Sequence, residues 1–169
     1  MRALTLTQPF AGLVAAGVKL VENRPRSMIR REDFGTRFAV HASREIDDEA
    51  FATIYRIAPE LRVRAAEARA KSRWHQLAGI TSAVLAVATI ERAVILDRNE
   101  APATVVRDLH THELVELGPQ GRWFVGPVGY VLRDVRALTE PVPCGGRQCF
   151  WSLSPDIEAR VVEQLGRAA

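Results

Sequence analysis

Apolar and polar positions predict a strand followed by a helix at the start of the chain. From Arg2 to Thr7 the two kinds of residue alternate, which is the period of a half-buried strand. The next apolar residues recur at helical spacing: Phe10, Leu13, Val14 and Val18. With Thr7 as N-cap and Gly17 as the stop, the pattern predicts a helix of about two to three turns.

The residues after this helix are strongly polar but again alternate. The stretch "KLVENR" (19–24) predicts a strand that ends before Pro25. Alternation puts Glu22 and Arg24 on one face of this strand and Lys19 on the other.

Four later segments also have strand character. Residues 35–43 and 129–138 alternate, and a last short strand follows the Pro/Gly turn within 141–153. Residues 81–96 are rich in Val, Ile and Thr and are almost continuously apolar, so this strand is expected at the centre of the sheet.

Helices are expected in three further places. One runs from Ser43, as N-cap, to about Gln76, and Pro59 divides it. Another is expected around 105–117, and an amphipathic helix covers about 155–167. Strands and helices at irregular intervals indicate an α+β fold with a curved mixed sheet or small barrel.

Charge points weakly to an anionic partner. The formal net charge is only +3, but arginine greatly outnumbers lysine, and a guanidinium binds carboxylate or phosphate through two parallel hydrogen bonds. If 60–76 is one helix, Arg62, Arg69 and Arg73 share a face and form a basic stripe suited to phosphates.

Length, cysteines and hydropathy set the class of protein. The chain of 169 residues is expected to form one domain. Only two cysteines and no apolar run near the roughly 20 residues of a membrane span predict a cytoplasmic protein outside the membrane. The spacing of Cys144 and Cys149 with His110 and His112 matches no common zinc site, so neither metal nor cofactor is expected.

A polar cluster is expected where the chain returns after the first helix. Gln8, Lys19, Glu22 and Arg24 would line a cleft there, in which a base edge or phosphate could be bound. The alternative is a surface ion-pair cluster of little energetic weight. His41 and Ser43, at a strand end, are either further binding residues or structural ones.

Three ordered blocks resemble the ASCH family: "ALTLTQPF" (3–10), "GVKLVENR" (17–24) and "VHAS" (40–43). Segments within 126–151 look like the closing strands of bacterial ASCH proteins. The resemblance covers roughly 2–43 and 80–153, so 44–79 is interpreted as a helical insertion in a single domain 1–169. It implies a small PUA-like mixed β-barrel with flanking helices, and a cleft beside the first helix for RNA, ahead of DNA, or a modified nucleotide.

The resemblance also carries an enzymatic alternative. Some ASCH relatives are amidohydrolases of N4-acetylcytidine that use a lysine at the position of Lys19, a threonine where Glu22 stands, and a later acid. Without that hydroxyl, Glu22 would have to activate water beside Lys19. The later acid is left open between Glu91, Asp108 and Glu113, and a nuclease is a weaker alternative.

Aromatic residues add a candidate base platform. Each of four aromatic residues would either stack on a base or pack in the core: Trp123, Phe124, Tyr130 and Trp151. Of these, Tyr130 is expected to contact the ligand. The oligomeric state is left open.

Overall fold

The computed structural model describes residues 1–63, 66–96 and 105–167, which fall into two compact units. The first unit contains Met1–Val18, Arg37–Ala88 and Val135–Ala169, and the second contains Lys19–Thr36 and Thr89–Asp134. The described strands are β1 (Arg2–Gln8), β2 (Val21–Arg24), β3 (Arg37–Ile46), β4 (Ala83–Leu96), β5 (Val105–Asp108), β6 (Leu114–Glu116), β7 (Val128–Pro143) and β8 (Phe150–Ser152). The described α-helices are α1 (Phe10–Ala15), α2 (Asp48–Ile57), α3 (Ala66–Lys71), α4 (Arg73–Ala78) and α5 (Pro155–Arg167), and short 3-10 turns are η1 (Arg31–Asp33), η2 (Pro59–Leu61) and η3 (Gly118–Trp123).

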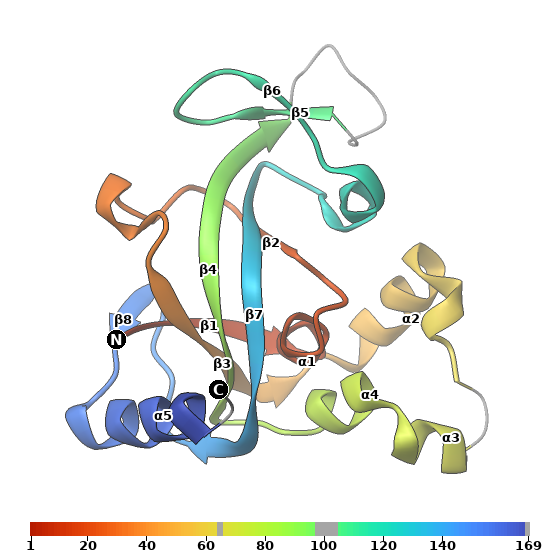
Figure 1. Cartoon of the computed structure of the whole chain (residues 1–169). Coiled ribbons are helices and arrows are strands. Elements are labelled where there is room, and N and C mark those ends of the chain that lie inside the picture. The colour runs from red at the N-terminus through yellow and green to blue at the C-terminus, as the bar shows by residue number, and fades with distance from the viewer. Residues whose placement is uncertain (64–65, 97–104, 168–169) are drawn as a thin grey trace. The chain divides into compact units, whose positions relative to one another are not determined.

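The strands form one mixed sheet in the order β2-β7-β4-β3-β1-β8, with β5 beside β4 and β6 beside β5. Figure 1 shows β4 and β7 as the two long strands, and each crosses the boundary between the units. β1 is parallel to β3 and antiparallel to β8, so the sheet is mixed as expected. Among the described strands β2 and β8 are the ends of this order, and the sheet is not closed into a barrel. The α+β class is confirmed and the barrel is not.

The core of the first unit lies between its strands and α5. Buried side chains from five elements meet there: Ala3, Ala39, Val84, Val87, Leu138, Val142, Ile157 and Val161. The two residues from α5, Ile157 and Val161, are one turn apart and therefore share a face. Burial of these apolar surfaces is the main contribution to the stability of this unit.

The first helix begins differently from the expectation. β1 continues through Gln8, so Thr7 is part of the strand and Pro9 occupies the N-cap position without a side-chain hydrogen bond. The Gln8 Oε1 atom accepts from the Gly12 backbone N–H at 3.0 Å and so satisfies one donor of the first turn. Gly17, at φ +74°, ends the helical segment as expected.

The second helix begins later than predicted. β3 continues to Ile46, whose backbone pairs with Gln8 of β1, and α2 begins at Asp48. The N-cap is Asp47, whose carboxylate accepts from the Ala50 N–H at 3.1 Å. Ser43 as N-cap was therefore wrong, because strand pairing extends beyond it.

The helix predicted around 105–117 was also wrong. This segment is the β5–β6 hairpin, in which Val106 pairs with Val115. Its turn is held by the Asp108 carboxylate, which accepts from the N–H groups of His110 and Thr111 at 2.8 and 3.0 Å. Although burial acts in the opposite direction, these hydrogen bonds and the nearby charge of Arg92 lower the pKa of Asp108.

Within the described ranges, no helix has both the length and the apolar content needed to cross a membrane.

Candidate functional site

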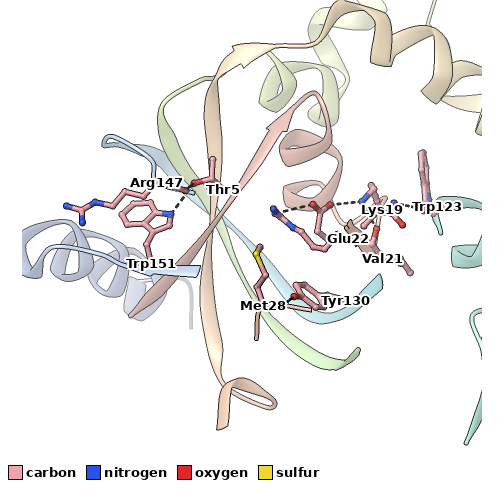
Figure 2. A network of polar contacts seen from close by, with 11 residues as sticks. Thr5, Lys19, Val21, Glu22, Met28, Trp123, Tyr130, Arg147 and Trp151 are labelled. Atoms are coloured by element: carbon pink, nitrogen blue, oxygen red, sulfur yellow. Dashed lines mark hydrogen bonds and ion pairs between the residues drawn. The ribbon is translucent and has the colours of Figure 1, made fainter. Parts of the chain in front are cut away.

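The second unit contains a nearly buried cluster of three charged side chains, Lys19, Glu22 and Arg24. The Lys19 ammonium donates to Glu22 Oε2 at 2.8 Å, and Arg24 Nη2 lies 3.3 Å from Glu22 Oε1. Their side chains are 3%, 11% and 15% exposed, respectively. Figure 2 shows the Lys19 side chain directed at the Glu22 carboxylate. Three of the four polar residues expected together therefore form one cluster that is not on the open surface.

β2 positions two members of this cluster. Val21–Arg24 pairs antiparallel with β7, which places Glu22 opposite Tyr130 and Arg24 opposite Val128. Lys19 precedes the strand, and its ammonium also donates to the Val21 carbonyl at 2.5 Å. The expectation that Lys19 faces away from Glu22 was wrong, because β2 begins only at Val21 and strand alternation does not apply to Lys19.

Two amide side chains hold β2 against the segment that includes η3. The Asn23 side chain donates to the Trp123 carbonyl at 2.7 Å and accepts from the Val125 N–H at 3.0 Å. Gln120 Oε1 accepts from the Leu20 N–H at 2.8 Å. Sequence reasoning missed these supports, and Gln120 lies in a polar stretch whose pattern gives no signal for the contact.

Tyr130 is a structural residue of the same unit. Its ring is fully buried, and its hydroxyl accepts from the Met28 N–H at 2.8 Å, as Figure 2 also shows. Trp123 and Phe124 are also buried. Because none of these rings offers an open face, they contribute packing and not a base platform.

The cluster places two cations beside one carboxylate in a region with little water. Desolvated charges are costly unless they are paired, and Lys19 and Arg24 are each paired with Glu22 here. The close pair of ammonium and carboxylate also supplies a proton donor and a proton acceptor within hydrogen-bond distance.

Gln8 belongs to a separate polar network within the first unit. Its side chain is fully buried, and its amide nitrogen donates to the carbonyls of Leu77 and Ile80 at 2.8 and 2.5 Å. With Gly12 bonded to its oxygen, Gln8 ties α1 to the end of α4. Both ends of the amide are used by backbone groups, so Gln8 has a structural function in the fold.

His41 lies in another buried group of the first unit. Its Nε2 is 3.1 Å from the Cys144 carbonyl, its ring packs edge-on against Trp151, and Nδ1 has no partner among the described residues. Burial lowers the pKa of His41, although the hydrogen bond to Cys144 acts in the opposite direction. Thr5 joins the group by accepting from the Trp151 indole at 3.1 Å and donating to the Arg147 carbonyl at 2.8 Å (Figure 2).

Comparison with known proteins rests on structure. No protein-family model and no curated protein matches the sequence. The crystal structure of ASCH from Zymomonas mobilis superposes with a TM-score of 0.51 at 16% identity, over 96% of this chain and 93% of that chain. The chain has an ASCH-like fold. Two single-substitution variants of the Zymomonas mobilis protein agree, with a TM-score of 0.50 for each, 15% and 16% identity, 96% of this chain, and 94% and 96% of theirs.

The resemblance drawn from the sequence blocks is thus confirmed for the fold. At this identity the comparison shows a shared ASCH-like architecture, and the chemistry of the site depends on the residues of this chain.

The basic stripe does not lie on one helix of the ASCH-like chain. Arg62 follows η2 and is exposed, with its guanidinium 5.9 Å from the centre of the Tyr55 ring, whereas Arg73 is the exposed first residue of α4. The Arg69 side chain lies outside the described residues. The spacing argument was wrong because Arg62 has extended backbone before α3 and because the extended Ser72 separates α3 from α4.

Ser43 and the three later acids each have local partners in this ASCH-like fold. The Ser43 hydroxyl donates to the Glu45 carbonyl at 2.8 Å. Glu91 pairs with Arg92 at 2.6 Å, Glu113 contacts Thr111, and Asp108 holds the turn described above. Each acid thus has a local contact that does not involve the cluster around Lys19.

Metal ligands are not grouped in the described part of the chain, where no three His, Cys, Asp or Glu side chains could hold an ion together. Cys144 and Cys149 are free thiols.

Proposed function

We propose that this ASCH-like chain is a PUA-like module that binds RNA or a modified nucleotide at Lys19, Glu22 and Arg24. The observation that carries the proposal is the nearly buried cluster of two cations around one carboxylate. RNA is preferred to DNA in this proposal because the sequence blocks resemble ASCH proteins, a family whose cleft is thought to receive RNA or a nucleotide.

The two cations of the cluster favour a phosphate as the ligand. Arg24 is the most exposed member of the cluster, so an incoming ligand meets its guanidinium first. A guanidinium matches two phosphate oxygens with two parallel hydrogen bonds, and the surrounding protein screens this contact less than water would.

The carboxylate gives the site a second kind of contact. Glu22 is held by Lys19 on one oxygen and by Arg24 on the other, which fixes its orientation. A fixed carboxylate can accept a hydrogen bond from the exocyclic amino group of cytosine or adenine. The proposed ligand therefore combines a phosphate with an amino-bearing base.

Binding of a labelled single-stranded RNA pool, followed by fluorescence anisotropy at 50 and 200 mM salt, tests this proposal. We expect Arg24→Gln to weaken binding by about tenfold, because one charged hydrogen-bonding partner is lost. Arg133→Gln is the matched control, since Arg133 is an exposed arginine of the same unit paired with Asp134. It should change affinity less than twofold.

Salt dependence adds an independent criterion, because contacts to phosphates release counterions and weaken steeply as salt rises. Binding that is absent, that does not respond to salt, or that responds equally to both substitutions would contradict the proposal.

A second candidate, hydrolysis of N4-acylated cytidine, is favoured by the 2.8 Å contact between Lys19 and Glu22. Glu22 would take a proton from water while the water oxygen bonds to the acyl carbon. The carbon–nitrogen bond would then break, with the proton passing to the leaving N4 amine and the acid released. Lys19 would stabilise the charge that develops on the acyl oxygen.

Release of acetate from N4-acetylcytidine distinguishes the two candidates. Turnover that is lost in both Glu22→Gln and Lys19→Met, while both variants keep the circular dichroism of the folded parent, would establish the hydrolase. An inert parent protein that still binds RNA would support the binding module. Cleavage of the RNA itself, lost in the same variants, would instead indicate a nuclease.

A further inference from the structure

The helical segment of the first unit contains two neighbouring hollows that the proposed site does not use. One, of about 550 Å³, is lined by residues that include Asp48, Phe51, His75 and Gln76. The other, of about 440 Å³, is lined by Ala52, Tyr55, Arg56 and Arg62. Both volumes fall within the roughly 300 to 1,000 Å³ of small-molecule sites.

Aromatic rings from α2 and α4 connect the linings of the two hollows. Trp74 is buried and packs against His75, with ring centres 3.8 Å apart, and lies 6.1 and 6.2 Å from the rings of Phe51 and Tyr55. The Tyr55 hydroxyl is 3.1 Å from His75 Nε2 and so joins the two helices, of which Figure 1 shows α4 next to α3. The aromatic residues of both linings are therefore packed against one buried ring, that of Trp74.

The two hollows differ in chemistry. The first presents the half-buried rings of Phe51 and His75 together with the carboxylate of Asp48 and the amide of Gln76. The second presents two exposed arginines, Arg56 and Arg62. A planar ring with hydrogen-bonding edges suits the first hollow, and an anion suits the second.

We propose that α2 and α4 form a second, separate site for one nucleotide unit, with the base in the hollow of Phe51 and His75 and its phosphate at Arg56 and Arg62. Aromatic side chains stack on any base, and the Asp48 carboxylate selects those with an exocyclic amino group. Arg56 and Arg62 at the other hollow carry the positive charge that complements the phosphate. This site stands independently of the proposed cluster at Lys19, Glu22 and Arg24.

Titration of the ¹⁵N-labelled full chain with cytidine 5′-monophosphate tests the proposal. We expect amide shifts concentrated in α2 and α4, and affinity at least fivefold above that of cytidine alone or inorganic phosphate alone. A short single-stranded oligocytidylate is the second ligand tested. If the strand binds more tightly than the monophosphate, the natural ligand is part of RNA or DNA. If the monophosphate binds more tightly, the natural ligand is a free nucleotide.

Substitutions locate the ligand. Arg56→Gln combined with Arg62→Gln should weaken monophosphate binding at least fivefold, and so should Phe51→Leu, which keeps an apolar side chain against Trp74. Arg37→Gln is the matched control, because Arg37 is an exposed arginine of the same unit that lines neither hollow. Equal weakening by the control would overturn the proposal in favour of general charge attraction.

Arg24→Gln separates this site from the proposed function. Unchanged helix shifts in that variant support two independent sites, even if RNA binding at the cluster is lost or was never present. Absence of shifts in α2 and α4, or equal binding of inorganic phosphate and monophosphate, would overturn the second site without bearing on the first.

Discussion

Gln8 and Lys19 were expected in the same cleft, and both are buried, but their surroundings differ. Gln8 is a neutral amide whose oxygen and nitrogen are bonded to backbone groups of its own unit. Lys19 is one of two cations around a single carboxylate. Burial of a polar residue therefore does not by itself mark a functional site. A group whose bonding capacity is filled by backbone atoms stabilises the fold, whereas charged side chains held together at close range form a candidate binding site.

Lys19→Met should have the largest effect on stability. It removes the closer of the two cations at Glu22 and the donor to the Val21 carbonyl, and the loss of about 1.5–3 and 1–3 kcal/mol for these two hydrogen bonds adds to about 3–5 kcal/mol. Denaturant unfolding followed by circular dichroism measures the change. Lys71→Met is the control, because Lys71 is exposed, and it should stay within about 0.5 kcal/mol of the parent. If Lys19→Met has the same free energy of unfolding as the parent, the cluster is exposed to water in solution.

Gln8→Leu should rank second, with a loss of about 2–4 kcal/mol. The substitution removes a donor from the Ile80 carbonyl and the acceptor of the Gly12 N–H, and each buried unpaired group costs about 1–3 kcal/mol, whereas the Leu77 carbonyl keeps the Ile80 N–H at 3.2 Å. Hydrogen exchange should rise first in α1 and α4. Gln148→Leu, at an exposed position, controls for the change of side chain. If Gln8→Leu weakens RNA binding without lowering the free energy of unfolding, Gln8 is a ligand-binding residue instead.

Gly12→Ala should cost about 1–3 kcal/mol. A Cβ atom on Gly12 would lie 2.5 Å from the Ala78 backbone nitrogen, so α1 and α4 would have to separate. Gly166→Ala is the matched control in α5, where nothing lies within 4 Å of the added carbon, and it should stabilise the chain by up to about 1 kcal/mol. Thermal unfolding of both variants gives the comparison, and a neutral Gly12→Ala would contradict this packing.

A pH effect from His41 should be the smallest. Burial lowers the pKa of His41 in the folded chain, so the unfolded chain takes up a proton near its usual value of 6.5 that the folded chain does not. The free energy of unfolding should therefore decrease as pH falls below about 6.5, until the lowered pKa is reached.

His41→Gln should flatten this dependence in denaturant unfolding measured between pH 5 and 7.5, whereas His112→Asn, at an exposed position, should preserve it. An unchanged slope in His41→Gln would assign the titration to another group.

The sequence predicted the strands well where one face had to be buried. Alternation located β1 and most of β3, and the apolar run located β4, because burial imposes these patterns directly. It failed at 105–117, where the hairpin depends on the turn at Asp108, and at Ser43, where pairing between distant strands overrides a local cap signal.

For the candidate site, the nearness of Lys19, Glu22 and Arg24 followed from their short separation along the chain. The function of Gln8 could not be predicted, because its partners at Leu77 and Ile80 are about seventy residues away and no local pattern marks them. The prediction that three arginines share one helix face was wrong for a related reason. Residues on either side of a break in a helix no longer follow the helical spacing, so they do not share a face.

The close approach of α1 and α4 also has a meaning for comparisons between sequences. With Gly12 against the Ala78 backbone and Gln8 bonded to the Leu77 carbonyl, α4 is a structural partner of the first helix. A related chain without an α4 docked in this way would be free to carry a larger residue at the position of Gly12 and an apolar one at the position of Gln8. The identities of these two residues, read together, can therefore sort ASCH-like chains by whether they carry this helical layer.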